Sequence, residues 1–267
     1  MWVVTLILIS VILFLLYKLK RTKKLEYKCF LLTLKNSRKR RETFLKNHDP
    51  TVPIEIIYSV DTKSVENARK YQKIIDPKYF KEALELHYNK NKTRTNITYF
   101  DMGAIGCYMG HMEFYRRCFE QGLKYAVIFE DNVVVKTDAL YDKIQSVIDV
   151  MGDNFEMCFF HCLSRYPDKK QNGLEKVKWI SSTKCYLINV ENMQKYYSVF
   201  FPIDNHVDMK HEDIIAKGAR VFYKDLRNYM YIDRSHSSTI GHSEWGEKNH
   251  FSKQYPTATT DVLEYGY

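Results

Sequence analysis

The chain has 267 residues, of which 45% are hydrophobic and 15% aromatic, and it carries a formal net charge of +9. This apolar content is enough for a packed core and excludes a chain that is disordered throughout. Once the first 24 residues are set aside, roughly 240 remain, which suits one large α/β domain or two small ones.

The first segment of the chain, residues 2–17, is continuously apolar and uncharged. A membrane-spanning helix needs about 20 apolar residues, with a lower limit near 17. Trp2 and Tyr17 stand at the two ends of the run, where interfacial aromatic residues are common. A cleaved signal peptide is the alternative, but it carries its positive charge before the apolar core, whereas here the basic residues follow. We therefore predict an uncleaved, single-pass membrane anchor with a basic flank over residues 1–24.

The basic flank bears on membrane orientation and on partners. Positive charge directly after an apolar span keeps that side in the cytoplasm, so we expect the folded domain there. The sequons at 91–93 and 96–98 matter only in a lumen. Six scattered cysteines suit a reducing compartment, and without a CxxC pair they predict no zinc site. A nucleic-acid arm is the alternative for the flank, but no recognition motif accompanies it, so we expect no nucleic-acid partner.

Strands and helices alternate along the rest of the chain. Strands are expected at 28–34, 53–59 and 124–129, near 156–162 and 184–189, and at 219–224 and 228–232. Helices are expected from a cap at Ser37 to about Asn47, over 64–87 with a break near Pro77, at 103–122, at 138–150 and near 191–200. This order predicts an α/β domain over residues 25–245 with a mainly parallel sheet flanked by helices. A polar loop at 88–100 and a polar tail at 246–267 complete the chain.

Acidic residues follow several of these elements. Asp61 closes the second predicted strand, Glu130-Asp131-Asn132 closes the strand at 124–129, and Asp204 follows the helix near 191–200. In open α/β sheets, ligands bind beyond the carboxyl ends of the strands. Carboxylates there can bind ribose hydroxyls or hold a divalent ion beside a diphosphate. Each cluster alone is equally consistent with a solvated turn, so spacing leaves both interpretations open.

The motifs, taken in order over residues 28–241, resemble glycosyltransferase family 25. This family includes bacterial lipooligosaccharide galactosyltransferases and collagen hydroxylysine galactosyltransferases. The similar stretches are Leu31 to Arg41, Ser59-Val60-Asp61-Thr62, Gly103-Ala104-Ile105-Gly106-Cys107-Tyr108-Met109-Gly110-His111, Ala126 to Asn132, Lys184 to Ile188, Pro202-Ile203-Asp204, and Ser237-Ser238-Thr239-Ile240-Gly241. The third and fourth are similar to the family's most specific pair, Gly-x-x-Gly-Cys-x-x-Ser-His and Glu-Asp-Asp.

The resemblance implies a GT-A-like fold and a role in lipopolysaccharide biosynthesis or related glycosylation. It further implies transfer of a hexose, galactose or glucose, from a UDP-sugar to a glycan or protein hydroxyl with inversion. The expected cofactor is Mn²⁺, with Asp131 as its ligand. Around the donor it places Thr33, Arg40, Asp61, Glu130, Asp131 and Asn132.

On the acceptor side, the resemblance makes Asp204 the candidate base. His111, on the long helix near the acidic strand end, is a candidate catalyst or a structural hydrogen-bonding group.

Three residues depart from the family pattern. Asn132 replaces the last Asp of the acidic triplet, Gly110 replaces the Ser before the His, and Thr62 replaces a Gly. An amide oxygen ligates a hard cation without contributing charge, so metal affinity should fall. The metal requirement is therefore open, and the alternative function is a catalytically impaired glycosyltransferase-fold protein that binds or scaffolds.

Overall fold

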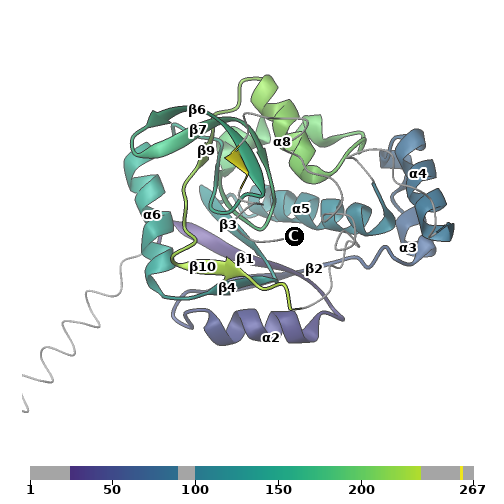
Figure 1. Ribbon diagram of the computed structural model, residues 1–267, viewed down its shortest axis with the longest axis horizontal. Coiled ribbons are helices and arrows are strands. Elements are labelled where there is room, and N and C mark those ends of the chain that lie inside the picture. Colours follow the sequence, from purple (N-terminus) through teal and green to yellow (C-terminus); the bar gives the residue numbers. More distant parts are fainter. Residues whose placement is uncertain (1–24, 90–99, 236–258, 261–267) are drawn as a thin grey trace, which may run out of the picture.

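The structure is a computed structural model that describes residues 25–89, 100–235 and 259–260 (Figure 1). The predicted anchor and basic flank (1–24), both sequons, the motif at 237–241 and most of the predicted tail lie outside the described residues. Within the described ranges, no helix combines the length and the apolar composition that crossing a membrane requires.

The described residues build one large sheet of nine strands in the order β11-β6-β7-β9-β5-β8-β3-β1-β2. Its strands are β1 (Tyr27–Leu34), β2 (Ile54–Ser59), β3 (Tyr125–Glu130), β5 (Met157–Phe159), β6 (Ser164–Gln171), β7 (Leu174–Ser181), β8 (Cys185–Asn189), β9 (Val221–Tyr223) and β11 (Thr259–Thr260). A separate two-stranded ladder joins β4 (Val133–Val135) to β10 (Met230–Ile232).

The sheet is parallel at one side and mixed at the other. β1 lies between β2 and β3 and runs parallel to both, so this side of the sheet agrees with the predicted mainly parallel sheet. β8 is inserted antiparallel between β3 and β5, and β5 is in turn parallel to β9. β6 and β7 form an antiparallel hairpin whose turn residues Asn172 and Gly173 both have positive φ. Such a turn joins antiparallel strands without a crossover helix, and the sequence analysis did not anticipate this hairpin.

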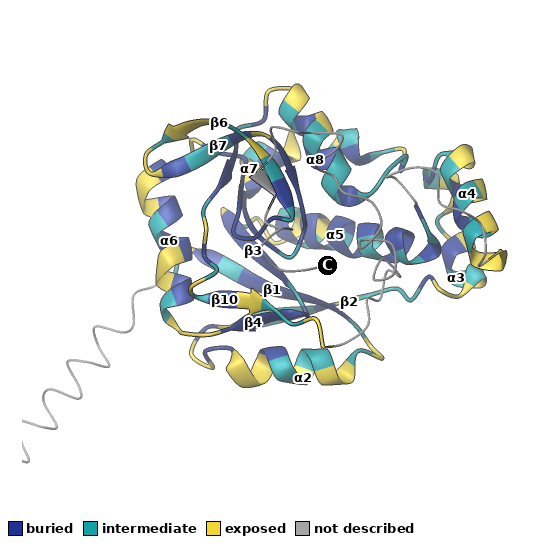
Figure 2. Ribbon diagram, in the orientation of Figure 1, coloured by how far each residue is buried: buried dark blue, intermediate teal, exposed yellow. Residues whose placement is uncertain are grey.

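Helices cover both faces of the sheet (Figures 1 and 2). Phe44 of α2 (Arg38–Asn47) and Ile144 of α6 (Ala139–Met151) belong to one apolar core. The opposite core includes Phe80 of α4 (Pro77–Tyr88), Phe114 of α5 (Met102–Glu120) and Ile214 of α8 (Val207–Ala216). The remaining short helices are α3 (Val65–Arg69), η1 (Gln72–Ile74), α7 (Val190–Gln194) and η2 (Tyr197–Phe200).

Most predicted elements agree with the structure to within a few residues, with three corrections. Ser37 occupies the N-cap position of α2, but its side chain makes no capping hydrogen bond, so the predicted cap is wrong in that respect. The helix expected near 191–200 is two short pieces, α7 and η2. Helix α8 was not predicted; the acidic residues that follow Asp204 lie on it.

Side-chain alternation along β1 and β3 decides which residues reach each face. Leu31 and Phe129 belong to the core beneath α2, whereas Leu32 and Ile128 belong to the core beneath α5. Successive residues of a strand point to opposite faces. At the strand ends, Thr33 and Asp131 therefore face α2, and Glu130 faces α5.

Helix α5 approaches the end of β2 closely enough to require glycine. A Cβ built on Gly106 would lie 2.6 Å from both the Val60 carbonyl oxygen and the Thr62 hydroxyl. A Cβ on Gly110 would lie 2.7 Å from a Leu32 methyl and 2.9 Å from the Ser59 hydroxyl. Thr62, which departs from the family pattern, donates its buried hydroxyl to the Met102 carbonyl. Both departures in this region thus have a packing role in this chain.

Candidate active site

The polar residues at the carboxyl ends of β1 and β3 form two clusters on opposite faces of the sheet. The first, the Asp131 cluster, consists of Thr33, Arg40 and Asp131. The Thr33 hydroxyl donates to Asp131 Oδ2 at 2.7 Å, and Arg40 Nη1 lies 3.4 Å from Asp131 Oδ1. The side chains of Arg40 and Asp131 are 11% and 9% exposed. The structure therefore brings together three of the residues that the sequence placed around the donor.

The Asp131 cluster retains unsatisfied polar capacity. Burial raises the pKa of the Asp131 carboxyl, and the charge of Arg40 and the hydrogen bond from Thr33 offset that effect only in part. In the described part of the chain, Arg40 Nε of the cluster has no hydrogen-bond partner, and neither has the buried Oδ1 of Asn132, the residue that follows Asp131. Buried polar groups are nearly always paired, so unpaired ones at a strand end fit a surface that is completed by a ligand.

The second cluster, the Glu130 cluster, consists of Cys107, His111, Glu130, Thr183 and Lys184. Thr183 donates to Glu130 Oε1 at 2.6 Å, and Lys184 Nζ lies 2.6 Å from Oε2. The Glu130 amide also donates to the Lys184 carbonyl at 2.8 Å, which fixes the start of β8 beside the end of β3. Burial by itself would raise the pKa of the Glu130 carboxyl, but the Lys184 charge and the interaction with His111 outweigh it and hold that pKa well below its usual range.

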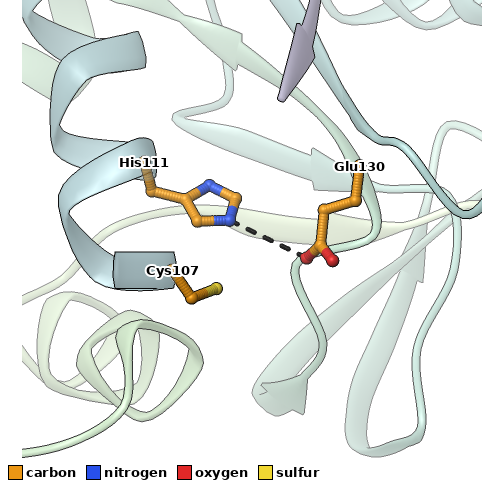
Figure 3. A group of neighbouring side chains, drawn as sticks. All are labelled: Cys107, His111 and Glu130. Atoms are coloured by element: carbon orange, nitrogen blue, oxygen red, sulfur yellow. Dashed lines mark ion pairs between the residues drawn. The ribbon is translucent and has the colours of Figure 1, made fainter. Parts of the chain in front are cut away.

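His111 approaches Glu130 from α5. Its Nε2 lies 3.8 Å from Glu130 Oε1, and its Nδ1 is hydrogen-bonded to the Tyr186 hydroxyl at 2.8 Å. The imidazole is fully buried and stacks on the Tyr186 ring, with centroids 5.7 Å apart. Cys107 lies one helical turn before His111 and points toward the same space (Figure 3).

Sequence reasoning missed Cys107, Thr183 and Lys184 as members of this cluster. The i, i+4 spacing of Cys107 and His111 on a predicted helix was a usable signal, because residues four apart share a face. Thr183 and Lys184 gave no such signal, since the antiparallel pairing of β8 with β3 brings them in from more than fifty residues away.

The remaining site residues of the sequence analysis belong to neither cluster. Asp61 accepts a hydrogen bond from Asn36 Nδ2 at 3.0 Å and so links the loops that follow β1 and β2. Asp204 follows the cis Phe201–Pro202 peptide and pairs with Lys210 Nζ at 2.5 Å. The Asp204 side chain is 42% exposed and that of Lys210 only 6%. The assigned roles of Asp61 and Asp204 stay predictions.

The oxygen atoms around Asp131 do not fit Mn²⁺. That ion prefers several hard oxygen ligands. Asp131 is the one carboxylate of its cluster, and the other two members are the hydroxyl of Thr33 and the cationic guanidinium of Arg40. Among the described residues, Cys107, His111 and Glu130 are the one group of three His, Cys, Asp or Glu side chains whose ligand atoms could share an ion, and Asp131 is not among them. No step is therefore assigned to Mn²⁺.

Comparisons with known proteins bear on this geometry. A family model described as glycosyltransferase family 25 (LPS biosynthesis protein) matches residues 26–235. No curated protein matches the sequence.

Solved structures with a similar fold include mouse xyloside xylosyltransferase 1, with a TM-score of 0.41, 9% identity and coverage of 75% of this chain and 84% of that chain. A glycosyltransferase involved in glycosylation of the PBCV-1 major capsid has a TM-score of 0.39 and 11% identity, and the coverage is 82% of this chain and 97% of that chain. An active-site mutant of LgtC has a TM-score of 0.34 and 12% identity, covering 75% of this chain and 73% of that chain. These likenesses are too remote to indicate an activity.

Proposed function

The chain belongs to glycosyltransferase family 25, and on that premise we propose that it transfers a hexose from a UDP-sugar to a hydroxyl of a glycan or protein acceptor. Membership makes it a glycosyltransferase. Three details of the reaction are proposals. The donor is a UDP-sugar, the sugar is galactose or glucose, and the transfer inverts the anomeric carbon.

One observation carries this proposal, namely the position and pairing of the Asp131 cluster. Thr33 and Asp131 lie at the carboxyl ends of two adjacent parallel strands, where open α/β sheets bind ligands. Arg40 reaches the same point from the first turn of α2. A guanidinium presents its donors in a planar fork that suits phosphate oxygens. We assign the diphosphate to Arg40 and a ribose hydroxyl to Asp131.

The proposed reaction is a single in-line displacement. The acceptor hydroxyl oxygen attacks the anomeric carbon, the bond from that carbon to the UDP oxygen breaks, and the acceptor proton passes to a carboxylate. Asp204 is our candidate for that carboxylate, and the ion pair with Lys210 fixes its orientation. Arg40 offsets the charge that develops on the departing UDP.

We also propose that residues 1–24 anchor the chain in a membrane with the transferase domain on the cytoplasmic side. The uncharged run at 2–17 and the basic residues behind it support this proposal. Protease added to sealed right-side-out vesicles should leave the domain intact and should digest it only after the vesicles are opened. Digestion in sealed vesicles would place the domain on the other side.

The test of the activity is UDP release from a panel of UDP-sugars by the full chain, without added Mn²⁺. We expect UDP release from one hexose donor, faster when a glycan acceptor mixture is present. UDP should also raise the melting temperature of the protein. If UDP binds but no donor is consumed with any acceptor, the scaffold alternative holds. If UDP does not bind at all, the donor assignment is wrong.

A further inference from the structure

We propose that Cys107, His111 and Glu130 form a binding site for a divalent transition metal ion that accepts sulfur ligands, with Zn²⁺ as the best match. Figure 3 shows the three side chains. By the alternation of side chains at the strand end, the site lies on the α5 side of the sheet, opposite the Asp131 cluster. The inference concerns metal binding alone and does not depend on the donor, acceptor or chemistry proposed above.

The three ligand atoms are already gathered. Sγ of Cys107, a ring nitrogen of His111 and a carboxylate oxygen of Glu130 all lie within 4.8 Å of one another, and His111 Nε2 is 3.8 Å from Glu130 Oε1. In a tetrahedral zinc site with bonds of about 2.0–2.3 Å, neighbouring ligand atoms lie roughly 3.3–3.7 Å apart. Small rotations of the Cys107 and Glu130 side chains would therefore close the site around an ion without moving the backbone.

His111 is held as a metal ligand would be held. Its Nδ1 is engaged by the Tyr186 hydroxyl, which fixes the ring and leaves Nε2 directed at Glu130 and the Cys107 thiol. That Nε2 belongs to a fully buried side chain and, among the described residues, makes no hydrogen bond, its contact with Glu130 being the 3.8 Å ion pair. A buried unpaired nitrogen is rare in proteins, and metal-ligating histidines commonly have their second nitrogen hydrogen-bonded in this way. The unpaired Nε2 is an independent indication of a missing ligand.

Glu130 can take an ion without losing its present partners. An ionised carboxylate has about four acceptor positions on its two oxygens. Thr183 uses one position on Oε1 and Lys184 one on Oε2, so Oε1 retains a position toward His111. Hydrogen bonds to the carboxylate that ligates a metal are the usual support for such a ligand. Thr183 and Lys184 therefore orient Glu130 rather than compete with the ion.

The donor set selects the class of metal. One sulfur, one imidazole nitrogen and one carboxylate oxygen make three protein ligands with a fourth position open, a pattern found at zinc sites that keep a water or a substrate. Mn²⁺ and Mg²⁺ prefer oxygen-only sites. Coordination requires the Cys107 thiolate, so binding the ion releases the thiol proton to solvent. The ion, the thiolate and the carboxylate together are neutral, so the ammonium of Lys184 leaves the cluster with one net positive charge.

The direct test is Co²⁺ binding to the full chain, purified without a histidine tag and stripped with a chelator. We expect one equivalent of Co²⁺ to bind with a thiolate-to-cobalt charge-transfer band, and Zn²⁺ to displace it. Cys107→Ala should abolish the band. The matched control is Cys118→Ala, which removes a buried thiol from the same helix outside the cluster and should retain the band. His111→Ala should weaken the affinity by about 10-fold or more.

A band that persists in Cys107→Ala, or none in the unaltered chain, would overturn the proposal. Because Cys107→Ala or His111→Ala could fail to fold, X-ray absorption at the zinc edge of the unaltered, zinc-loaded chain gives a second measurement. It should report one sulfur at about 2.3 Å and lighter ligands at about 2.0–2.2 Å. A shell of nitrogen and oxygen alone would rule out Cys107 as a ligand. Either failure leaves the proposed glycosyl transfer untouched.

Discussion

Glu130 and Asp131 are neighbours in the chain, yet the protein places them in opposite environments. Glu130 faces α5, where Lys184, Thr183 and His111 surround it and its pKa is held below the usual range. Asp131 faces α2, where Thr33 and Arg40 are the partners of its oxygens among the described residues and burial raises its pKa. The sheet separates the two carboxylates because successive residues at a strand end point to opposite faces. The pair that sequence alone treats as one acidic motif is therefore two sites, one on each face of the sheet.

The helices α2 and α5 also contribute to the two sites in different ways. α2 places the guanidinium of Arg40 at the strand end and packs on the sheet through Phe44, its one buried side chain. α5 has eleven buried residues and packs closely against the end of β2. This helix positions Cys107 and His111. A site held by α5 should thus tolerate less change than a site held by α2.

The largest expected effect is on turnover at the Asp131 cluster. Asp131→Ala should lower the rate of UDP release by about 10²-fold or more, because it removes the group that orients the donor and Arg40. Asp142→Ala, which removes an exposed carboxylate from α6, is the control and should keep the rate. Near-normal turnover in the Asp131 variant would exclude this cluster from the reaction.

The next effect is on stability: substitutions of Glu130 and Asp131 should change the free energy of unfolding with opposite dependence on pH. Glu130→Gln should lower the free energy of unfolding by about 3 kcal/mol at pH 7, since it leaves Lys184 without its buried partner. The folded pKa of Glu130 lies below its unfolded value, so this contribution is present above about pH 4.3 and is lost as the pH falls through the folded pKa.

Asp131→Asn should show the reverse trend. The folded pKa of Asp131 lies above the unfolded value, so ionisation opposes folding above the folded pKa, and acid relieves that penalty. Stability of the Asn variant relative to the unaltered chain should therefore rise with pH from about 3 to 6. The free energy of unfolding of both variants, relative to the unaltered chain, can be measured in urea across this pH range. If it changes with pH in the same direction for both variants, the separation of the two sites is contradicted.

A smaller effect tests the packing of α5 on β2. Gly106→Ala should destabilise the protein by about 1–3 kcal/mol, because its methyl group meets the fixed Val60 carbonyl oxygen. Gly110→Ala is the matched variant and should be less damaging, because its methyl meets the movable side chains of Leu32 and Ser59. Thermal unfolding of the two proteins gives the order, and a larger loss for Gly110→Ala would show that the backbone at Val60 yields more easily than the side chains of Leu32 and Ser59.

The smallest effect concerns the helix caps. Asp101 accepts a hydrogen bond from the Ala104 amide at the start of α5, so Asp101→Ala should lower the free energy of unfolding by about 1 kcal/mol. Ser37→Ala at the start of α2 should change it by less than about 0.5 kcal/mol, since the Ser37 side chain makes no capping bond. Equal losses, measured by urea unfolding, would mean that Ser37 does cap α2 in solution.

The local elements, and the residues that stand at their ends, could be predicted from the amino-acid sequence. Hydrophobic runs predicted β1, β2 and β3, helical spacing predicted α5, and the family resemblance drew attention to Thr33, Arg40 and Asp131, which the structure then brings together. These predictions succeed because burial imposes a period on the chain that can be seen over ten to twenty residues. Parallel neighbours joined by a helix also follow from the alternation of strands and helices.

The strand that lies beside β3, and hence the surroundings of each carboxylate, depend on long-range pairing in the folded chain. The antiparallel insertion of β8 brings Lys184 to Glu130, and the path through η2 and α8 pairs Asp204 with Lys210 instead of with either cluster. Such contacts join residues that are distant in sequence, and no local period encodes them. Strand pairing is set by how whole faces bury against each other. The alternation of side chains at a strand end could have separated Glu130 from Asp131 in the sequence, but not the residues that surround each of them.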